Sequence, residues 1–361
     1  MNANACDKKR IALVSMTNIY LVPYIENYIR ALSSKANIDV IYWDRHRVKE
    51  KMPEVNLITI SINMPESSHK FRKLAGYIRF AIIAIRYLIL GRYDRVVLLT
   101  TSPAILFFPV LKILFRKRYI VEIRDYTAEY SCIVRLIEEL LFSDAQMLIV
   151  SSRGFLKFLP RKYEYVVAHN MPNQYFLTTS AIEASPRMKT PIRIGMIGLI
   201  RFHDTIKKFI RKMANDERFE LLFIGKGSEE LETFLLHESI KNVTIEGAFD
   251  PSMTFDKYAN VDIVNNLYGN GLPQLDYALS NKLYIAAISK KPILVCKGTY
   301  MQEVSKGFNI AIDLNDLNLS DEIYDCYNSV KSDEITKAAA SFITKCIEDQ
   351  NKYMASIASM I

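Results

Sequence analysis

The segment from Asp276 to Leu314, DYALSNKLYIAAISKKPILVCKGTYMQEVSKGFNIAIDL, decides the fold of this chain. It opens with a polar turn at residues 280–282, which precedes a helix, a Lys-Lys-Pro turn and a buried strand over 292–295. A second helix and another strand follow. This alternation predicts parallel α/β layers, in which ligands lie at the carboxyl ends of strands. Ser, Asn and Lys at a helix entrance offer free backbone N–H groups and one cation, which suit a diphosphate.

The run SNKLY…KKPILV…GFNIAIDL, which begins at Ser280, resembles the nucleotide-sugar segment of the retaining glycosyltransferases of family 4. The resemblance implies a GT-B fold: two Rossmann-like βαβ domains facing a central cleft, with a C-terminal helix crossing back to the first domain. It also implies transfer of a sugar from a nucleotide-diphosphate sugar without a metal or other cofactor. The Glu-x7-Glu pair of many family members is replaced here by Tyr277 and Ile285, and a turn residue that is usually small is Lys290. The contact to the donor ribose is therefore left open, with nearby polar side chains as candidates: Tyr268, Asn270, Gln274 and Asp276.

The length of 361 residues suits two domains. Buried strands are predicted at 10–15, 39–43, 57–62, 95–99, 118–123 and 147–150, and again at 192–197, 220–224, 243–246 and 261–265. A polar segment at 178–190 predicts the linker. We therefore expect an acceptor-side, membrane-facing domain at 1–177, a nucleotide-sugar domain at 191–345, and a C-terminal helix at 346–361 that returns to the first domain.

The charge and the cysteine content of the sequence indicate the environment in which the protein acts. The net charge is +8, and many of the basic residues lie between Arg45 and Arg118. No nucleic-acid signature with interleaved aromatic residues accompanies them, so anionic membrane is the favoured polyanion. Five scattered cysteines favour a reducing compartment. No signal-peptide core is evident, and no stretch is expected to span a bilayer, so a cytoplasmic protein is predicted.

Two cations are the candidate catalytic residues of the second domain. Gly195 and Gly198 end a predicted strand, and Arg201 follows three residues later. The resemblance implies that Arg201 binds the donor diphosphate; the alternative is a plain turn with a surface arginine. Lys282 would join it, because two cations stabilise a departing diphosphate without a metal. The alternative for Lys282 is a solvated helix N-terminus.

Further donor contacts are predicted around these cations. Gly198, Lys226, Ser280, Asn281 and Tyr277 are the candidates. The turn Gly225–Lys226–Gly227 resembles a family turn near the base and ribose, although any βα turn could carry it. No acidic pair adjoins a strand end, and no second ligand accompanies His203, so no metal site is predicted.

In the first domain, EIRDYTAEY follows a predicted strand and places Glu122, Arg124 and Asp125 at its carboxyl end. Asp125 is predicted to orient or deprotonate the acceptor hydroxyl, or to stabilise positive charge at the anomeric carbon. Arg124 and Glu122 would lie on the acceptor side. The alternative is an ion pair of Arg124 with Asp125 or Glu129 that holds a loop.

Residues 70–92 form a helix-period segment in which Arg72, Arg79 and Arg86 are each seven apart and so share one stripe. Apolar residues cover much of the rest. Residues 103–115, followed by Arg116–Lys117–Arg118, add a second apolar piece edged with cations. The pattern is typical of a helix lying on anionic lipid, although helices packed on a sheet are also apolar on one face.

The sequence thus predicts a retaining transferase that moves a sugar onto a lipid-linked glycan in cell-surface polysaccharide biosynthesis, at the inner face of the membrane. Two alternatives stay open: a catalytically inactive GT-B-like scaffold subunit, favoured by the missing glutamates, and a nucleotide-sugar epimerase. The sugar, the base, the acceptor and the linkage stay undetermined.

Overall fold

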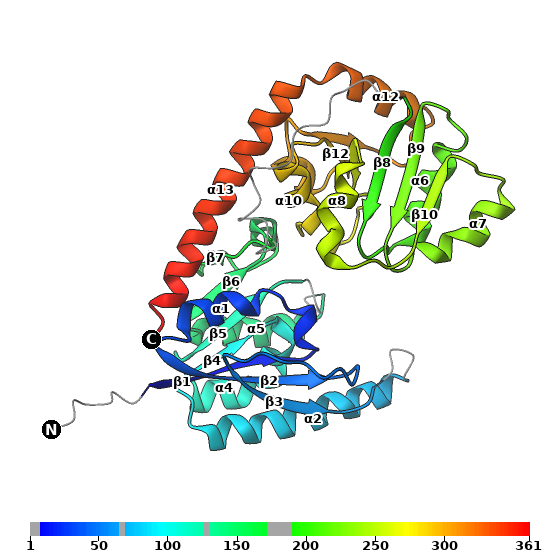
Figure 1. Cartoon of the computed structure of the whole chain (residues 1–361). Coiled ribbons are helices and arrows are strands. Elements are labelled where there is room, and N and C mark those ends of the chain that lie inside the picture. The colour runs from blue at the N-terminus through cyan, green and yellow to red at the C-terminus, as the bar shows by residue number, and fades with distance from the viewer. Residues whose placement is uncertain (1–7, 65–68, 126–129, 172–189) are drawn as a thin grey trace. The chain divides into compact units, whose positions relative to one another are not determined.

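The computed structural model describes residues 8–64, 69–125, 130–171 and 190–361. It contains two units, one formed by Met1–His169 with Glu348–Ile361 and the other by Asn170–Ile347 (Figure 1). The sequence placed the corresponding limits at 177 and 346, and the predicted linker at 178–190 lies, except for Thr190, outside the described residues. Each unit has one parallel sheet, as predicted.

The first unit is built on a seven-stranded sheet in the order β3-β2-β1-β4-β5-β6-β7, in which every strand pair is parallel. Its strands are β1 (Lys9–Ser15), β2 (Ala36–Asp44), β3 (Asn56–Ser61), β4 (Arg95–Leu98), β5 (Tyr119–Ile123), β6 (Met147–Val150) and β7 (Val166–Val167). β1, β2 and β5 are almost wholly buried, because helices cover both faces of a parallel sheet.

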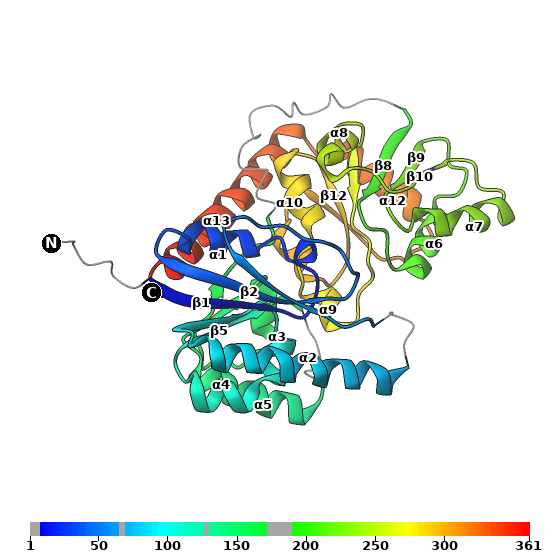
Figure 2. The same ribbon diagram turned by 60° about the horizontal axis from the view of Figure 1, so that its bottom comes forward.

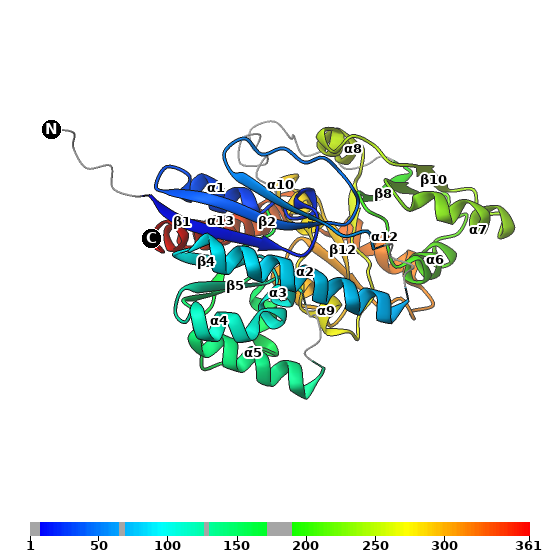
Figure 3. The ribbon, with the colours of Figure 1, turned by 90° about the horizontal axis from the view of Figure 1, so that it is seen from below.

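Helices cover this sheet on two sides (Figures 2 and 3). On one side lie α1 (Ile25–Leu32) and the end of α13 (Ser332–Ala358), where Tyr28 and Tyr353 join the strand side chains in one core. The other side carries α2 (Lys70–Gly91), α3 (Thr101–Leu106), α4 (Phe108–Leu114) and α5 (Cys132–Asp144). There Trp43 of β2 stacks on Phe80 of α2, with ring centroids 5.3 Å apart.

The second unit is a six-stranded parallel sheet in the order β10-β9-β8-β11-β12-β13. Its strands are β8 (Ile192–Ile197), β9 (Phe219–Ile224), β10 (Val243–Glu246), β11 (Ile263–Asn265), β12 (Ile293–Cys296) and β13 (Asn309–Ile312). Its helices are α6 (His203–Lys212), α7 (Glu232–His237), α8 (Thr254–Ala259), α9 (Pro273–Asp276), α10 (Asn281–Ile288), α11 (Tyr300–Val304), α12 (Leu319–Ser329) and the beginning of α13.

Two apolar cores flank this second sheet. α6 and α12 bury Phe209 and Ile323 on one face, whereas α8 and α10 bury Tyr258 and Leu283 on the other. The first half of α13 contributes Phe342 to the latter core. Since Tyr353 of the same helix belongs to the core of the first unit, the C-terminal helix returns to that unit, as predicted.

Candidate active site

The topology of the second sheet marks where a ligand would bind. β8 lies at its centre, with β9 on one side and β11 on the other. The chain leaves β8 through α6 toward β9, whereas it leaves β11 through α9 and α10 toward β12. The loops after β8 and β11 therefore run to opposite sides, which is the switch point where open α/β sheets hold their ligands.

Glycines bring backbone together at this point. Gly198 follows β8 and Gly225 follows β9, with φ of +105° and +130°, values that favour glycine. A Cβ at Gly225 would lie 1.9 Å from the carbonyl oxygen of Gly198, so the two turns are in direct backbone contact. A Cβ at Gly198 would lie 4.0 Å from Nζ of Lys282. The structure therefore brings together Gly198 and Lys282, two residues that the sequence assigned to the diphosphate.

Lys282 is a buried cation without a carboxylate partner. It lies in the first turn of α10 with 7% of its surface exposed. Nζ donates a hydrogen bond to the hydroxyl of Tyr268, 2.8 Å away, and lies 5.4 Å from the centroid of that ring. No acidic side chain in the described part of the chain lies within ion-pair distance of it. A desolvated ammonium paired only with a neutral hydroxyl is prepared for an anion.

The beginning of α10 is tied to the end of β11. Ser280 is the N-cap residue, and its Oγ donates to Oδ1 of Asn266 at 2.6 Å instead of capping the helix. Asn281 is exposed at the first position of the helix. Asn265, 1% exposed, accepts from the backbone N–H of Leu267, while its Nδ2 has no partner within the described residues. Asn265 and Asn266 were not among the residues predicted from the sequence, where two polar residues at the end of a predicted strand were the available signal.

Arg201 lies on the loop after β8 with an exposed side chain, and no ion pair or hydrogen bond of that side chain is found among the described residues. Its neighbour Phe202 contacts Tyr268, with ring centroids 5.3 Å apart, so this loop reaches the partner of Lys282. Lys226 is exposed within the turn after β9. His203 contacts the carbonyl oxygen of Gly227 at 2.8 Å, which holds that turn against the beginning of α6.

Tyr277 and Ile285 stand where the resembled family carries its two glutamates, and they differ in burial. Ile285 is 4% exposed and belongs to the apolar core beneath α10, whereas Tyr277 is half-buried directly after α9. Of the polar substitutes, Asp276 accepts from the backbone N–H of Gly271, and Asn270 donates to the carbonyl oxygen of Lys297. Of the substitutes suggested by the sequence, Tyr268 is the one that contacts Lys282.

Glu122 and Arg124, predicted to lie on the acceptor side, are both buried in the first unit. Glu122 is fully buried and ion-paired with Arg124, which is 6% exposed. Glu122 also accepts hydrogen bonds from Tyr28, at 2.5 Å, and from Tyr353, at 3.2 Å. Burial, together with the Glu122 carboxylate, raises the pKa of both tyrosines well above the usual range, so they remain donors. Glu122 and Arg124 thus join β5 to α1 and α13, and an acceptor would not reach them.

Asp125 differs from its two neighbours. It lies two residues after the end of β5 and its side chain is exposed. The alternative was an ion pair of Arg124 with Asp125 or Glu129, and Glu129 lies outside the described residues. Asp125 is therefore more accessible to solvent, and so to a substrate, than Glu122 and Arg124.

The helices α2, α4 and α5 lie on one side of the first sheet (Figure 3). They carry exposed apolar side chains. Arg72, Arg79 and Arg86 are exposed on α2. The exposed apolar residues of this α2–α5 face are Phe71, Leu74, Ile78, Ile82, Ile89 and Leu90 of α2, Ile113 and Leu114 of α4, and Ile133, Leu136 and Leu140 of α5.

The expectation that no stretch could span a bilayer was wrong by length and composition. Residues 71–91 of α2 are long and apolar enough, with a mean hydropathy of 1.6, and 28% of the window is buried. The same helix packs on the sheet through Phe80, Ala84 and Leu88. The helix therefore packs on its own sheet on one side and exposes apolar side chains on the other.

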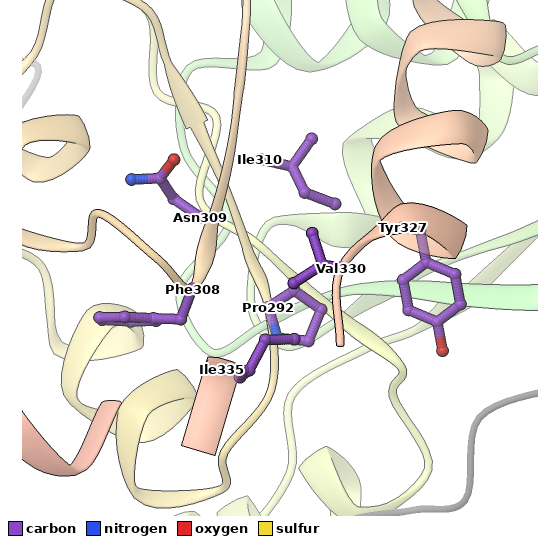
Figure 4. Close-up of a pocket in the computed structure, with 7 residues that line it drawn as sticks. All are labelled: Pro292, Phe308, Asn309, Ile310, Tyr327, Val330 and Ile335. Atoms are coloured by element: carbon purple, nitrogen blue, oxygen red, sulfur yellow. The ribbon is translucent and has the colours of Figure 1, made fainter. Parts of the chain in front are cut away.

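Away from the switch point, an apolar depression lies between the beginnings of β12 and β13 and the helices α12 and α13 (Figure 4). Pro292, Phe308, Ile310 and Ile335 are among its lining residues. It opens at the amino ends of the strands, opposite to the edge where such sheets bind ligands.

Across residues 8–64, 69–125, 130–171 and 190–361, no three His, Cys, Asp or Glu side chains gather as metal ligands.

No family model and no curated protein matches the chain. It is similar in structure to sucrose-phosphate synthase from Thermosynechococcus elongatus, with a TM-score of 0.67 and 12% identity over 98% of this chain and 100% of that one. HepE from Anabaena, solved with UDP and glucose, is similar with a TM-score of 0.65 and 11% identity, over 97% of this chain and 100% of that one. A UDP-forming α,α-trehalose-phosphate synthase from Burkholderia xenovorans is similar with a TM-score of 0.67 and 11% identity, over 98% of this chain and 99% of that one. The chain therefore has the fold of these proteins, the GT-B fold of two Rossmann-like units.

Proposed function

We propose that this protein is a glycosyltransferase that uses a nucleotide-diphosphate sugar as donor. The observation that carries the proposal is the buried, uncompensated ammonium of Lys282 beside the Gly198 turn at the sheet's switch point. An anion is the ligand that such a group favours, and a turn rich in backbone N–H groups favours phosphate. Structures of similar fold were solved with UDP and with UDP-glucose, which supports a nucleoside diphosphate here.

In the proposed reaction, the bond between the anomeric carbon and the diphosphate oxygen breaks, and negative charge grows on the departing diphosphate. A bond forms between the anomeric carbon and the acceptor hydroxyl oxygen, and the proton of that hydroxyl passes to the departing diphosphate. Lys282 and Arg201 would stabilise that charge, aided by the N-terminus of α10. Asp125 would orient the acceptor hydroxyl. Retention at the anomeric carbon, as the family 4 resemblance implies, and independence of metal are parts of the proposal.

For the acceptor, we propose a lipid-linked glycan of cell-surface polysaccharide synthesis, reached by a cytoplasmic protein bound peripherally to the inner face of the membrane. The exposed apolar residues of the α2–α5 face and the arginines of α2 support this assignment. Apolar side chains would enter the lipid interface, while the arginines would contact anionic headgroups.

A scaffold role is the second candidate, because burial of Ile285 leaves α10 without the family's ribose ligand. Calorimetric titration with UDP, GDP and their common sugar conjugates decides between the two. Saturable binding to the wild type that is lost in Arg201→Ala supports the transferase and identifies its base. Absence of binding to all of these ligands would refute the donor site and favour the scaffold.

A further inference from the structure

The guanidinium of Arg45 is held in place by aromatic side chains and has no carboxylate partner among the described residues. It directly follows β2, and its Cζ lies 4.2 Å from the ring centroid of Trp43 and 5.5 Å from that of Tyr77. Its Nε is buried without a hydrogen-bond partner. No carboxylate in the described part of the chain lies within ion-pair distance of the guanidinium. Two aromatic rings therefore fix its position while its charge remains available to a ligand.

The acidic residues near Arg45 have other partners. Asp44 accepts from Nδ2 of Asn18 at 2.9 Å and from the backbone N–H of Val48 at 3.2 Å. Glu50 accepts from the backbone N–H groups of Ile19 and Tyr20, at 2.8 and 2.9 Å. The segment 45–51, RHRVKEK, also carries three exposed cations: Arg47, Lys49 and Lys51. Asp44 and Glu50 therefore accept from Asn18 and from loop backbone, whereas these three cations are exposed to solvent.

This cationic loop adjoins the apolar side of α2. Tyr77, which contacts Arg45, lies on α2 one residue before Ile78, and Ile78 is 48% exposed. Phe71 and Leu74, 78% and 55% exposed, precede it on the same helix. β2 runs toward the end at which α2 begins (Figure 1). An anchored guanidinium thus lies at the carboxyl edge of the sheet, next to the beginning of the α2–α5 face.

We propose that Arg45, with the cations of the 45–51 loop around it, binds a phosphate or diphosphate group carried by a lipid-anchored acceptor. A planar guanidinium binds two phosphate oxygens at once, and partial burial strengthens that contact. The apolar side chains of α2 would receive the attached lipid. The assignment of this phosphate to an acceptor rests on the proposed transferase function. The binding of a lipid-attached phosphate by Arg45 does not depend on that function.

Farnesyl diphosphate is a suitable soluble probe, with farnesol as its phosphate-free counterpart. We expect Arg45→Gln to weaken farnesyl diphosphate binding at least tenfold and Arg45→Lys to weaken it several-fold, because lysine keeps the charge but not the planar stack. Arg30→Gln, which removes an exposed arginine on α1, should bind like the wild type. Unchanged affinity in Arg45→Gln, or an equal loss of farnesol binding, would overturn the proposal.

The same titration in saturating UDP, and in Arg201→Ala, separates this site from the donor site. Farnesyl diphosphate affinity should persist in both cases, and its loss in either would place the probe in the donor site and overturn the proposal. If UDP fails to bind the wild type, the proposed donor function fails while the comparison of Arg45 variants still tests this site.

Vesicle flotation then identifies the source of the phosphate. Phosphatidylcholine vesicles carry either a polyprenyl diphosphate or phosphatidylglycerol at matched charge. Selective loss of binding to the polyprenyl diphosphate vesicles in Arg45→Gln supports an acceptor site. An equal loss on both vesicle types would show contact with bulk lipid headgroups and overturn the acceptor assignment.

Discussion

Replacement of Lys282 by methionine tests the centre of the proposed mechanism. Methionine keeps the unbranched shape of the buried side chain and removes its charge. At a separation of ~3 Å and an effective dielectric constant of ~20, a pair of unit charges interacts by about 5 kcal/mol, which is a ceiling for the contact. Removal of one preorganised donor from a site of developing charge costs about 10²–10³ in turnover. We expect a loss of that size.

Stability should change little in Lys282→Met. The hydroxyl of Tyr268 loses one hydrogen-bond donor, which costs about 1 kcal/mol. Removal of a buried charge that has no counter-ion offsets that loss. The melting temperature should therefore stay close to that of the wild type. Tyr268→Phe, which keeps the charge, should lower turnover by less than about tenfold, since a net hydrogen bond contributes about 0.5–1.5 kcal/mol.

Lys291 offers a matched control in the same unit. It is also buried, but its Nζ donates to the backbone carbonyl oxygens of Tyr258, Ala259 and Val261. Burial lowers its pKa to about 8. Lys291→Met should destabilise the protein by roughly 1–3 kcal/mol because carbonyl groups lose their donor, while the turnover per folded molecule is kept.

The assay is release of the nucleoside diphosphate identified by calorimetry, normalised to the folded fraction from circular dichroism. Turnover of Lys282→Met within threefold of the wild type, at an unchanged melting temperature, would contradict a role for Lys282 in stabilising the departing diphosphate. So would equal losses per folded molecule in Lys282→Met and Lys291→Met.

Glu122→Gln should lower the free energy of unfolding by about 3 kcal/mol, because it leaves the buried Arg124 without its carboxylate; urea unfolding measures this, and a change below 1 kcal/mol would contradict it. Burial lowers the pKa of His169 despite the opposing effect of Asp349, so the unfolded chain takes up the proton first. Stability should therefore fall as the pH drops below about 6.5, and His169→Gln should show a smaller fall between pH 7.5 and 5.5; equal falls would exclude this histidine as a source. Glutamate at three exposed positions of α2 should release the protein from phosphatidylglycerol vesicles, whereas undiminished flotation would refute lipid contact by this helix; the positions are Arg72, Arg79 and Arg86.

Much of the fold is readable from local patterns. Short runs of β-branched and aliphatic residues predicted β6, β8 and β10 at their observed bounds. β6 and β8 are largely buried, as expected for strands covered on both faces, whereas the edge strand β10 alternates between half-buried and exposed residues. The apolar piece at 103–115 was harder to read. It forms two helices that meet at Phe107, and Pro109 lies in the first turn of the second, where its missing N–H costs nothing.

The repeated strand–helix units, the glycine turns after β8 and β9, and the position of Lys282 at a helix entrance were predictable from the amino-acid sequence, since these depend on backbone preferences over a few residues. The order of strands decided that Gly198 and Lys282 meet, and strand order depends on contacts distant in sequence. The same reason explains Glu122, which looked accessible at a strand end until Tyr353, 231 residues away, covered it. A helix pattern likewise gives an apolar side, but only packing shows which apolar residues of α2 stay exposed.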